Sequence, residues 1–142
     1  MLSITLATQL KEAGLTWTPA QRDFFAIPDR EMDDQVFVIN FMMVGVGLLR
    51  GQPVVTFHGA VESPLDYLYL SEAVWLPTET QLRTILEEYL VGEPSPALNL
   101  NSTPDGYRCQ IQFRGETLNF EGFGVDEVYG LALLHVLKDT QV

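Results

Sequence analysis

The chain has 142 residues, of which 46% are hydrophobic and 19% are charged, and this composition excludes an intrinsically disordered protein. The length predicts one compact domain over residues 1–142. Eight Lys and Arg against 19 Asp and Glu give a net charge of −11, which disfavours nucleic-acid and anionic membrane partners. With a single cysteine, Cys109, and no signal segment at its start, the chain is expected to be cytoplasmic.

The first half of the chain predicts a helix, then three strands, then a second helix. Residues 3–13 carry apolar side chains at helical spacing and end at Gly14, a helix-stop signal. Apolar and β-branched residues predict strands in the segments 22–28, 34–44 and 53–59. Residues 63–76 begin with Ser-Pro, which is typical of a helix N-terminus, and predict the second helix.

Residues 36–49 form an uncharged run that could be a membrane-spanning segment, a nucleotide-binding loop or part of a protein core. It is shorter than the roughly 20 residues that a membrane-spanning helix needs. The glycines at 45, 47 and 51 lack the spacing of a dinucleotide-binding loop, and the chain contains no nucleoside-triphosphate loop motif, so we expect no cofactor. We therefore predict that the run is strand in the core of the protein, covered on both faces.

The second half of the chain repeats this order. Residues 78–90 predict an amphipathic helix that begins with a Thr78 to Gln81 capping box. Residues 107–120 alternate apolar and polar side chains around an Arg-Gly-Glu turn and predict a hairpin. Residues 125–139 predict a closing helix with acidic residues at its start.

The two halves also share a local pattern where a strand meets a helix. Phe57-His58-Gly59 precedes one predicted helix, and Phe120-Glu121-Gly122 precedes the other. The likeness fits either an internal duplication or a chance similarity between two strand-turn-helix segments. The sequence predicts an α+β fold of two α-β-β-β-α units, with about four helices packed on up to six antiparallel strands. The corresponding sub-units are residues 1–76 and 77–142.

Four stretches carry a resemblance to other proteins: LATQLKEAGLTW, WLPTETQLRTILEEYL, DGYRCQIQFRGETLNFEG and VDEVYGLALLHVL. They resemble small uncharacterised bacterial and phage proteins with an α-β-β-β-α sandwich, and some of those relatives carry a pilus-assembly label. Double-stranded-RNA-binding domains share the same element order. The resemblance covers most of the chain and implies a fold, not a functional signature.

Few residues of the sequence are candidates for binding, catalysis or metal coordination. His58 ends a predicted strand and is a candidate binding residue, as is Glu121 at the position equivalent to His58. Trp17 lies in a polar segment and is either a third binding residue or a lid over the core, and the lid is favoured because tryptophan usually buries most of its area. His58, Ser63 and Asp66 are close in sequence, but the serine is not part of a G-x-S-x-G nucleophile-elbow motif. We therefore expect no catalytic triad. The His and Cys residues lack metal-ligand spacing and the acidic segment 29–34 lacks the glycine of a calcium loop, so we expect no metal. Cys109 lies on the apolar side of its strand and is expected to be an inert, packed thiol.

Two functions follow from these observations. The first is a non-enzymatic interaction or accessory protein that acts through its acidic surface on a protein partner and also self-associates. The second is a small-ligand-binding protein or hydrolase that uses His58 with carboxylates in a cleft between the two sub-units. The lack of a nucleophile, metal set or cofactor motif favours the first, so an enzyme is the less favoured alternative.

Overall fold

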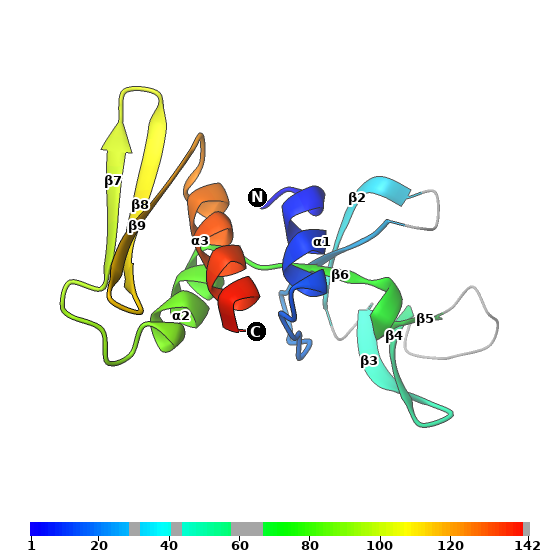
Figure 1. The fold of residues 1–142 in the computed structure, drawn as a ribbon. Helices are drawn as coiled ribbons and strands as arrows, with labels where there is room; N and C mark the ends of the chain where they lie inside the picture. The colour runs from blue at the N-terminus through cyan, green and yellow to red at the C-terminus, as the bar shows by residue number, and fades with distance from the viewer. Residues whose placement is uncertain (29–31, 41–43, 58–66, 141–142) are drawn as a thin grey trace. The chain divides into compact units, whose positions relative to one another are not determined.

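The structure is a computed structural model that describes residues 1–28, 32–40, 44–57 and 67–140 (Figure 1). Contacts divide the chain into two units: unit 1 is Met1–Leu15 with Pro77–Val142, and unit 2 is Thr16–Leu76. This division shares the boundary after residue 76 with the expected sub-units but places residues 1–15 with the C-terminal part. Three α-helices and three antiparallel three-stranded sheets occur in the described residues, which confirms the α+β class.

Unit 1 contains the three α-helices, which are α1 (Ile4–Glu12), α2 (Glu79–Tyr89) and α3 (Val125–Thr140). The sequence predicted all three. Helix α1 begins where the Ser3 hydroxyl accepts a hydrogen bond from the Leu6 backbone N–H, at 3.2 Å. Helix α2 begins with the predicted capping box. Both helices pack against α3, which has eight buried residues.

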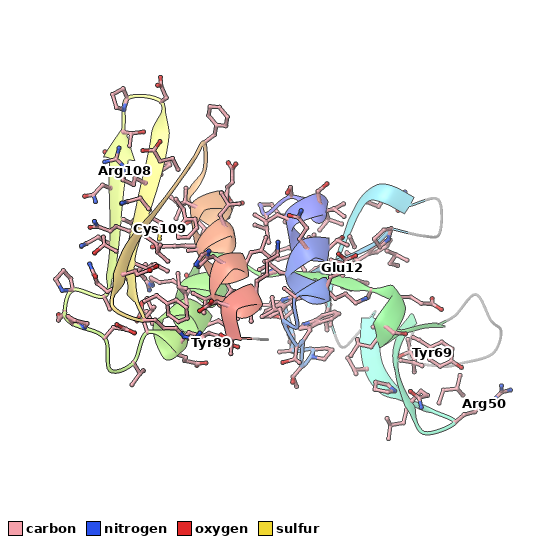
Figure 2. The ribbon with its side chains drawn as sticks, in the orientation of Figure 1. Glu12, Arg50, Tyr69, Tyr89, Arg108 and Cys109 are labelled. Carbon is pink, nitrogen blue, oxygen red and sulfur yellow. The ribbon has the colours of Figure 1, made fainter. Side chains whose placement is uncertain are left out.

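The sheet of unit 1 is a meander of β7 (Leu98–Thr103), β8 (Gly106–Phe113) and β9 (Glu116–Gly122), with β8 in the centre. Alternate residues of β8 point to opposite faces, so that Cys109 is fully buried while its neighbour Arg108 is exposed (Figure 2). The alternation that the sequence predicted for this hairpin is confirmed, and α3 covers its apolar face.

The described residues of unit 2 form two sheets and a short 3-10 helix at Leu70–Glu72. One sheet has the order β2-β1-β6, and the other has the order β3-β4-β5. Its core is a cluster of buried side chains on which Trp17, Phe37 and Leu70 pack. The six strands are β1 (Phe24–Ile27), β2 (Met32–Val38), β3 (Val44–Leu49), β4 (Gln52–Phe57), β5 (Tyr67–Tyr69) and β6 (Val74–Leu76).

The helix predicted over residues 63–76 is wrong for residues 67–76. Tyr67–Tyr69 pairs with β4, and Val74–Leu76 pairs with β1. The aromatic and β-branched residues of this segment suit strands, and pairing with neighbouring strands overrides the local helix-start signal. The predicted internal duplication is not confirmed, because the described part of this segment lacks its closing helix.

The prediction for residues 36–49 is also wrong in part. The run contains the last residues of β2 and the whole of β3, which belong to different sheets and lie at an edge of each in the described part of the chain. Alternate side chains of both strands face solvent, so these strands are not covered on both faces. The exposed fractions are 43% for Val36, 42% for Val38, 41% for Val46 and 76% for Leu48, while Ile39 is fully buried.

No helix among the residues that the structure describes combines the length and the hydrophobicity that crossing a membrane requires.

Candidate functional site

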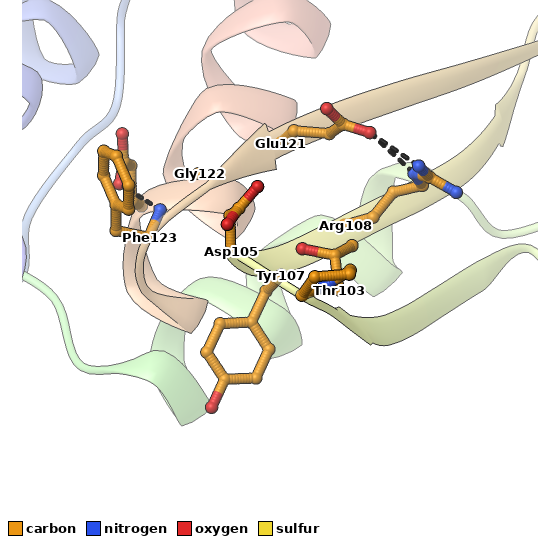
Figure 3. A pocket seen from close by; sticks show the side chains of 9 residues that line it. Thr103, Asp105, Tyr107, Arg108, Glu121, Gly122 and Phe123 are labelled. Atoms are coloured by element: carbon orange, nitrogen blue, oxygen red, sulfur yellow. Dashed lines mark hydrogen bonds and ion pairs between the residues drawn. The ribbon is translucent and has the colours of Figure 1, made fainter.

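A pocket of about 450 Å³ lies at one end of the unit 1 sheet (Figure 3). Two segments that are distant in sequence line it: the turn between β7 and β8 with the start of β8, and the end of β9 with the first turn of α3. The side chains that matter for its chemistry are Asp105, Arg108, Glu121, Phe123 and Glu127. We refer to these five residues as the acidic rim.

One glycine, Gly106, allows the strands to lie close together at this end of the sheet. A Cβ on Gly106 would lie directly against the carbonyl oxygen of Gly122, and 3.1 Å from the Cα of Phe123. The backbone of β9 therefore approaches β8 as closely as it does only because residue 106 has no side chain. This approach fixes where the chain leaves β9, and with it the position of Phe123.

Phe123 is the most exposed aromatic residue of unit 1. Its side chain is 84% exposed, although large apolar side chains are usually buried in a soluble protein. Its backbone is held in place because its N–H donates a hydrogen bond to Oε2 of Glu127, at 3.0 Å. The ring therefore projects into solvent from an ordered position, as a binding residue would.

Arg108 and Glu121 form an ion pair across β8 and β9, where they are direct cross-strand neighbours. Both Nε and Nη2 of Arg108 donate to Oε1 of Glu121, at 2.9 and 2.7 Å. The two side chains are 48% and 62% exposed, so the pair contributes at most about 1 kcal/mol to stability. Its main consequence is that one carboxylate of the rim is neutralised.

The rim is acidic overall. It holds three carboxylates, those of Asp105, Glu121 and Glu127, against the single cation of Arg108, which leaves a formal charge of −2. Figure 3 shows Asp105 between the ring of Phe123 and the Arg108–Glu121 pair. An exposed aromatic ring beside carboxylates is an arrangement that favours a cationic group.

Of the three predicted binding residues, the structure places only Glu121 in this pocket. Trp17 belongs to unit 2, where its ring stacks on Trp75 with a centroid distance of 6.3 Å and lies 5.7 Å from Phe25. Its Nε1 donates to Oδ2 of the buried Asp23, at 3.0 Å. Trp17 is thus packed over the core of unit 2. His58 lies outside the described residues.

None of the residues Asp105, Phe123 and Glu127 was predicted from the sequence as a binding residue. The sequence around Asp105 is typical of an ordinary turn, and Glu127 belongs to the acidic start of a predicted helix. The one available signal was Phe123 itself, an aromatic residue between two glycines directly after a strand. Such a position exposes a side chain because the flanking residues contribute none.

No group of three or more His, Cys, Asp or Glu side chains arranged to hold a metal ion occurs within residues 1–28, 32–40, 44–57 and 67–140. Residues 29–31 of the acidic segment 29–34 lie outside those ranges.

Cys109 is fully buried, and burial raises the pKa of its thiol from 9.0 to about 11. Between these values the unfolded chain ionises its thiol while the folded chain retains the proton. We therefore expect the free energy of unfolding to fall as the pH rises from 9 to 11. Urea unfolding at several pH values checks this, and Cys109→Ala should make the decline shallower. An identical decline in the variant would assign it to other groups.

Comparison with protein-family models, curated proteins and solved structures finds no match for this chain.

Proposed function

We propose that the protein is a non-enzymatic interaction protein whose acidic rim binds a basic segment of a partner protein. The observation that supports this most strongly is that Phe123 is 84% exposed. The hydrogen bond from its backbone N–H to Glu127 holds its backbone beside the rim carboxylates. Covering an exposed aromatic side chain with a partner removes apolar surface from water and so favours binding.

The chemistry of the rim favours an arginine or lysine side chain as the group that is bound. A guanidinium or ammonium group over the ring of Phe123 gains a cation–π interaction. The same group can donate charge-assisted hydrogen bonds to a carboxylate such as Asp105. An anionic or purely apolar group would leave the charge of the rim uncompensated.

The charge of the whole chain supports the same partner. A net charge of −11 attracts a basic segment from a distance and raises the rate of encounter. This attraction is not specific, so the rim is needed to select where the segment binds. We therefore expect binding that weakens as salt increases and that depends on Phe123.

A fluorescently labelled, arginine-rich peptide of about eight residues is a suitable probe for anisotropy titrations at roughly 150 mM salt, where screening extends about 8 Å. We expect Phe123→Ala and Asp105→Asn each to weaken binding about tenfold, which corresponds to about 1.4 kcal/mol.

Two matched controls separate the rim from general surface effects. Val91 is 83% exposed and apolar, so Val91→Ala removes a comparably exposed side chain elsewhere in unit 1. Glu88→Gln removes one exposed negative charge from α2. Both controls should bind within about twofold of the parent chain. Equal losses in Phe123→Ala and Val91→Ala would reject the rim as the binding site.

Nucleic acids should not bind. The phosphate backbone supplies most of the non-specific affinity for such ligands, and it is repelled by a surface with a net charge of −11. We expect duplex DNA and duplex RNA to give no anisotropy change at micromolar protein and roughly 150 mM salt. Micromolar binding to either one would contradict the proposed partner class.

The cytoplasmic location and the self-association inferred from the sequence stay predictions. The alternative function, a ligand-binding protein or hydrolase, depends on His58, which is not among the described residues.

A further inference from the structure

We infer that the partner segment binds as an added β-strand along the free edge of β7. This inference rests on the proposed function, because it says how the basic segment is held. It concerns a different surface from the acidic rim, namely the outer edge of the sheet that ends at the rim.

Strand β7 is an edge strand, and within the described part of the chain it pairs only with β8. The backbone N–H of Gln112 donates to the carbonyl of Ala97, which is its direct cross-strand neighbour in the register. Hydrogen-bonded and non-hydrogen-bonded pairs alternate along antiparallel strands. The backbone groups of Leu98, Leu100 and Ser102 therefore point away from β8, toward the free edge.

The sequence of β7 does nothing to block this edge. Proteins commonly protect edge strands with a lysine, a proline or a β-bulge. Strand β7 reads LNLNST, with no charge and no proline, and its register with β8 is regular from Leu98 to Thr103. Three outward residues in a regular register are enough to pair with a short added strand.

A pocket of about 560 Å³ lies beside the same edge, lined by α2, β7 and α3. Leu98 and Leu100 face the helices, because their cross-strand partners Ile111 and Cys109 are buried there. Together with Leu90 they make an apolar lining, and Leu100 is 37% exposed. A strand added to β7 would direct alternate side chains toward this pocket, which is how strand addition gains side-chain specificity.

Charge sets the composition of the added strand. Strand β7 runs from the apolar pocket to the turn that carries Asp105, over six residues or about 20 Å. A segment complementary to the apolar pocket and to the acidic turn is extended and has apolar residues at alternate positions. It carries arginine or lysine at the end that lies beside Ser102. A second copy of this chain fits less well, because bringing together two acidic surfaces is unfavourable.

Leu100→Pro tests the inference on the full chain. Proline removes the outward N–H of residue 100 and leaves the bonds between β7 and β8 in place, since edge strands accept proline at such positions. The probe is a peptide of about eight residues that alternates valine with threonine and ends in arginines. We expect Leu100→Pro to weaken its binding at least about tenfold, whereas Leu100→Val should bind within about twofold.

A second measurement keeps the test valid if Leu100→Pro fails to fold. In the parent chain, the backbone amides of Leu98, Leu100 and Ser102 should exchange with solvent quickly, and saturating peptide should protect them. The same peptide with N-methylated backbone amides should bind at least about tenfold more weakly.

The outcomes separate the two proposals. If Phe123→Ala weakens binding but Leu100→Pro and the N-methylated peptide do not, the basic partner stands and the added strand is wrong. If neither peptide binds the parent chain, both proposals fail. Protection of the same three amides by self-association alone, without peptide, would also overturn the inference.

Discussion

Gly106→Ala should destabilise the protein by about 3 kcal/mol, in line with the cost of forcing an extra carbon into closely packed structure. The added Cβ would meet the carbonyl oxygen of Gly122 and the Cα of Phe123. Both are backbone atoms, so no side-chain rotation relieves the overlap. Strands β8 and β9 must separate at this end, and we expect the variant to lose peptide binding at the acidic rim as well. Urea unfolding measures the first effect.

Gly47→Ala is the matched control. Gly47 is also in a strand, and a Cβ added there would have no heavy atom within 4 Å. We expect this variant to change the free energy of unfolding by no more than about 0.5 kcal/mol. Similar losses in the two variants would mean that the close approach of Gly106 to Gly122 is not what constrains this end of the sheet.

Asp23→Ala should cost about 3 kcal/mol in the stability of unit 2. Asp23 is only 5% exposed, and its Oδ2 accepts hydrogen bonds from Trp17 Nε1 and from the Ala20 backbone N–H, both at 3.0 Å. Removing the carboxylate leaves two donors without their acceptor, and each such loss costs about 1–3 kcal/mol where water cannot replace it. Chemical unfolding followed by tryptophan fluorescence measures the change, because Trp17 reports on its own release.

Asp23→Asn separates the hydrogen bonds from the charge. An asparagine oxygen can still accept from both donors, so we expect a loss clearly smaller than that of Asp23→Ala. An alanine variant as stable as the parent chain would show that Trp17 is not anchored through Asp23.

Local signals predicted the helices and one hairpin correctly. The capping box at Thr78 and the strict alternation on β8 are properties of short segments, and nothing elsewhere in the chain had to be known. The apolar spacing and the Gly14 stop signal that predicted α1 are signals of the same kind.

The segment 67–76 was mispredicted because its structure depends on distant partners. Its flanking signals, Ser-Pro before and Pro77 after, resemble helix boundaries. The partners of β5 and β6 lie in β4 and β1, and pairing with them decides the conformation. The run 36–49 failed for a related reason, since hydrophobicity alone does not show which strands lie at the edge of a sheet.

The candidate site was predicted at one residue only. Glu121 was selected through its position relative to His58, and the structure places it in the acidic rim. Asp105 lies in the turn before β8, whereas Phe123 and Glu127 follow β9, and the register of β8 with β9 brings these two segments together. Trp17 packs against the core of unit 2, which is the role that the sequence favoured for it over a binding role.

The most direct test of the acidic rim is a titration of the isotope-labelled chain with the arginine-rich peptide, followed through backbone amide chemical shifts. We expect saturable shifts at Asp105, Glu121, Phe123 and Glu127, and little change at Glu12 and Glu116, which carry exposed charges of the same sign away from the rim and from β7. Shifts of equal size at these two residues and on the rim would mean that the peptide binds to acidic surface in general. That result would contradict a binding site built around Phe123.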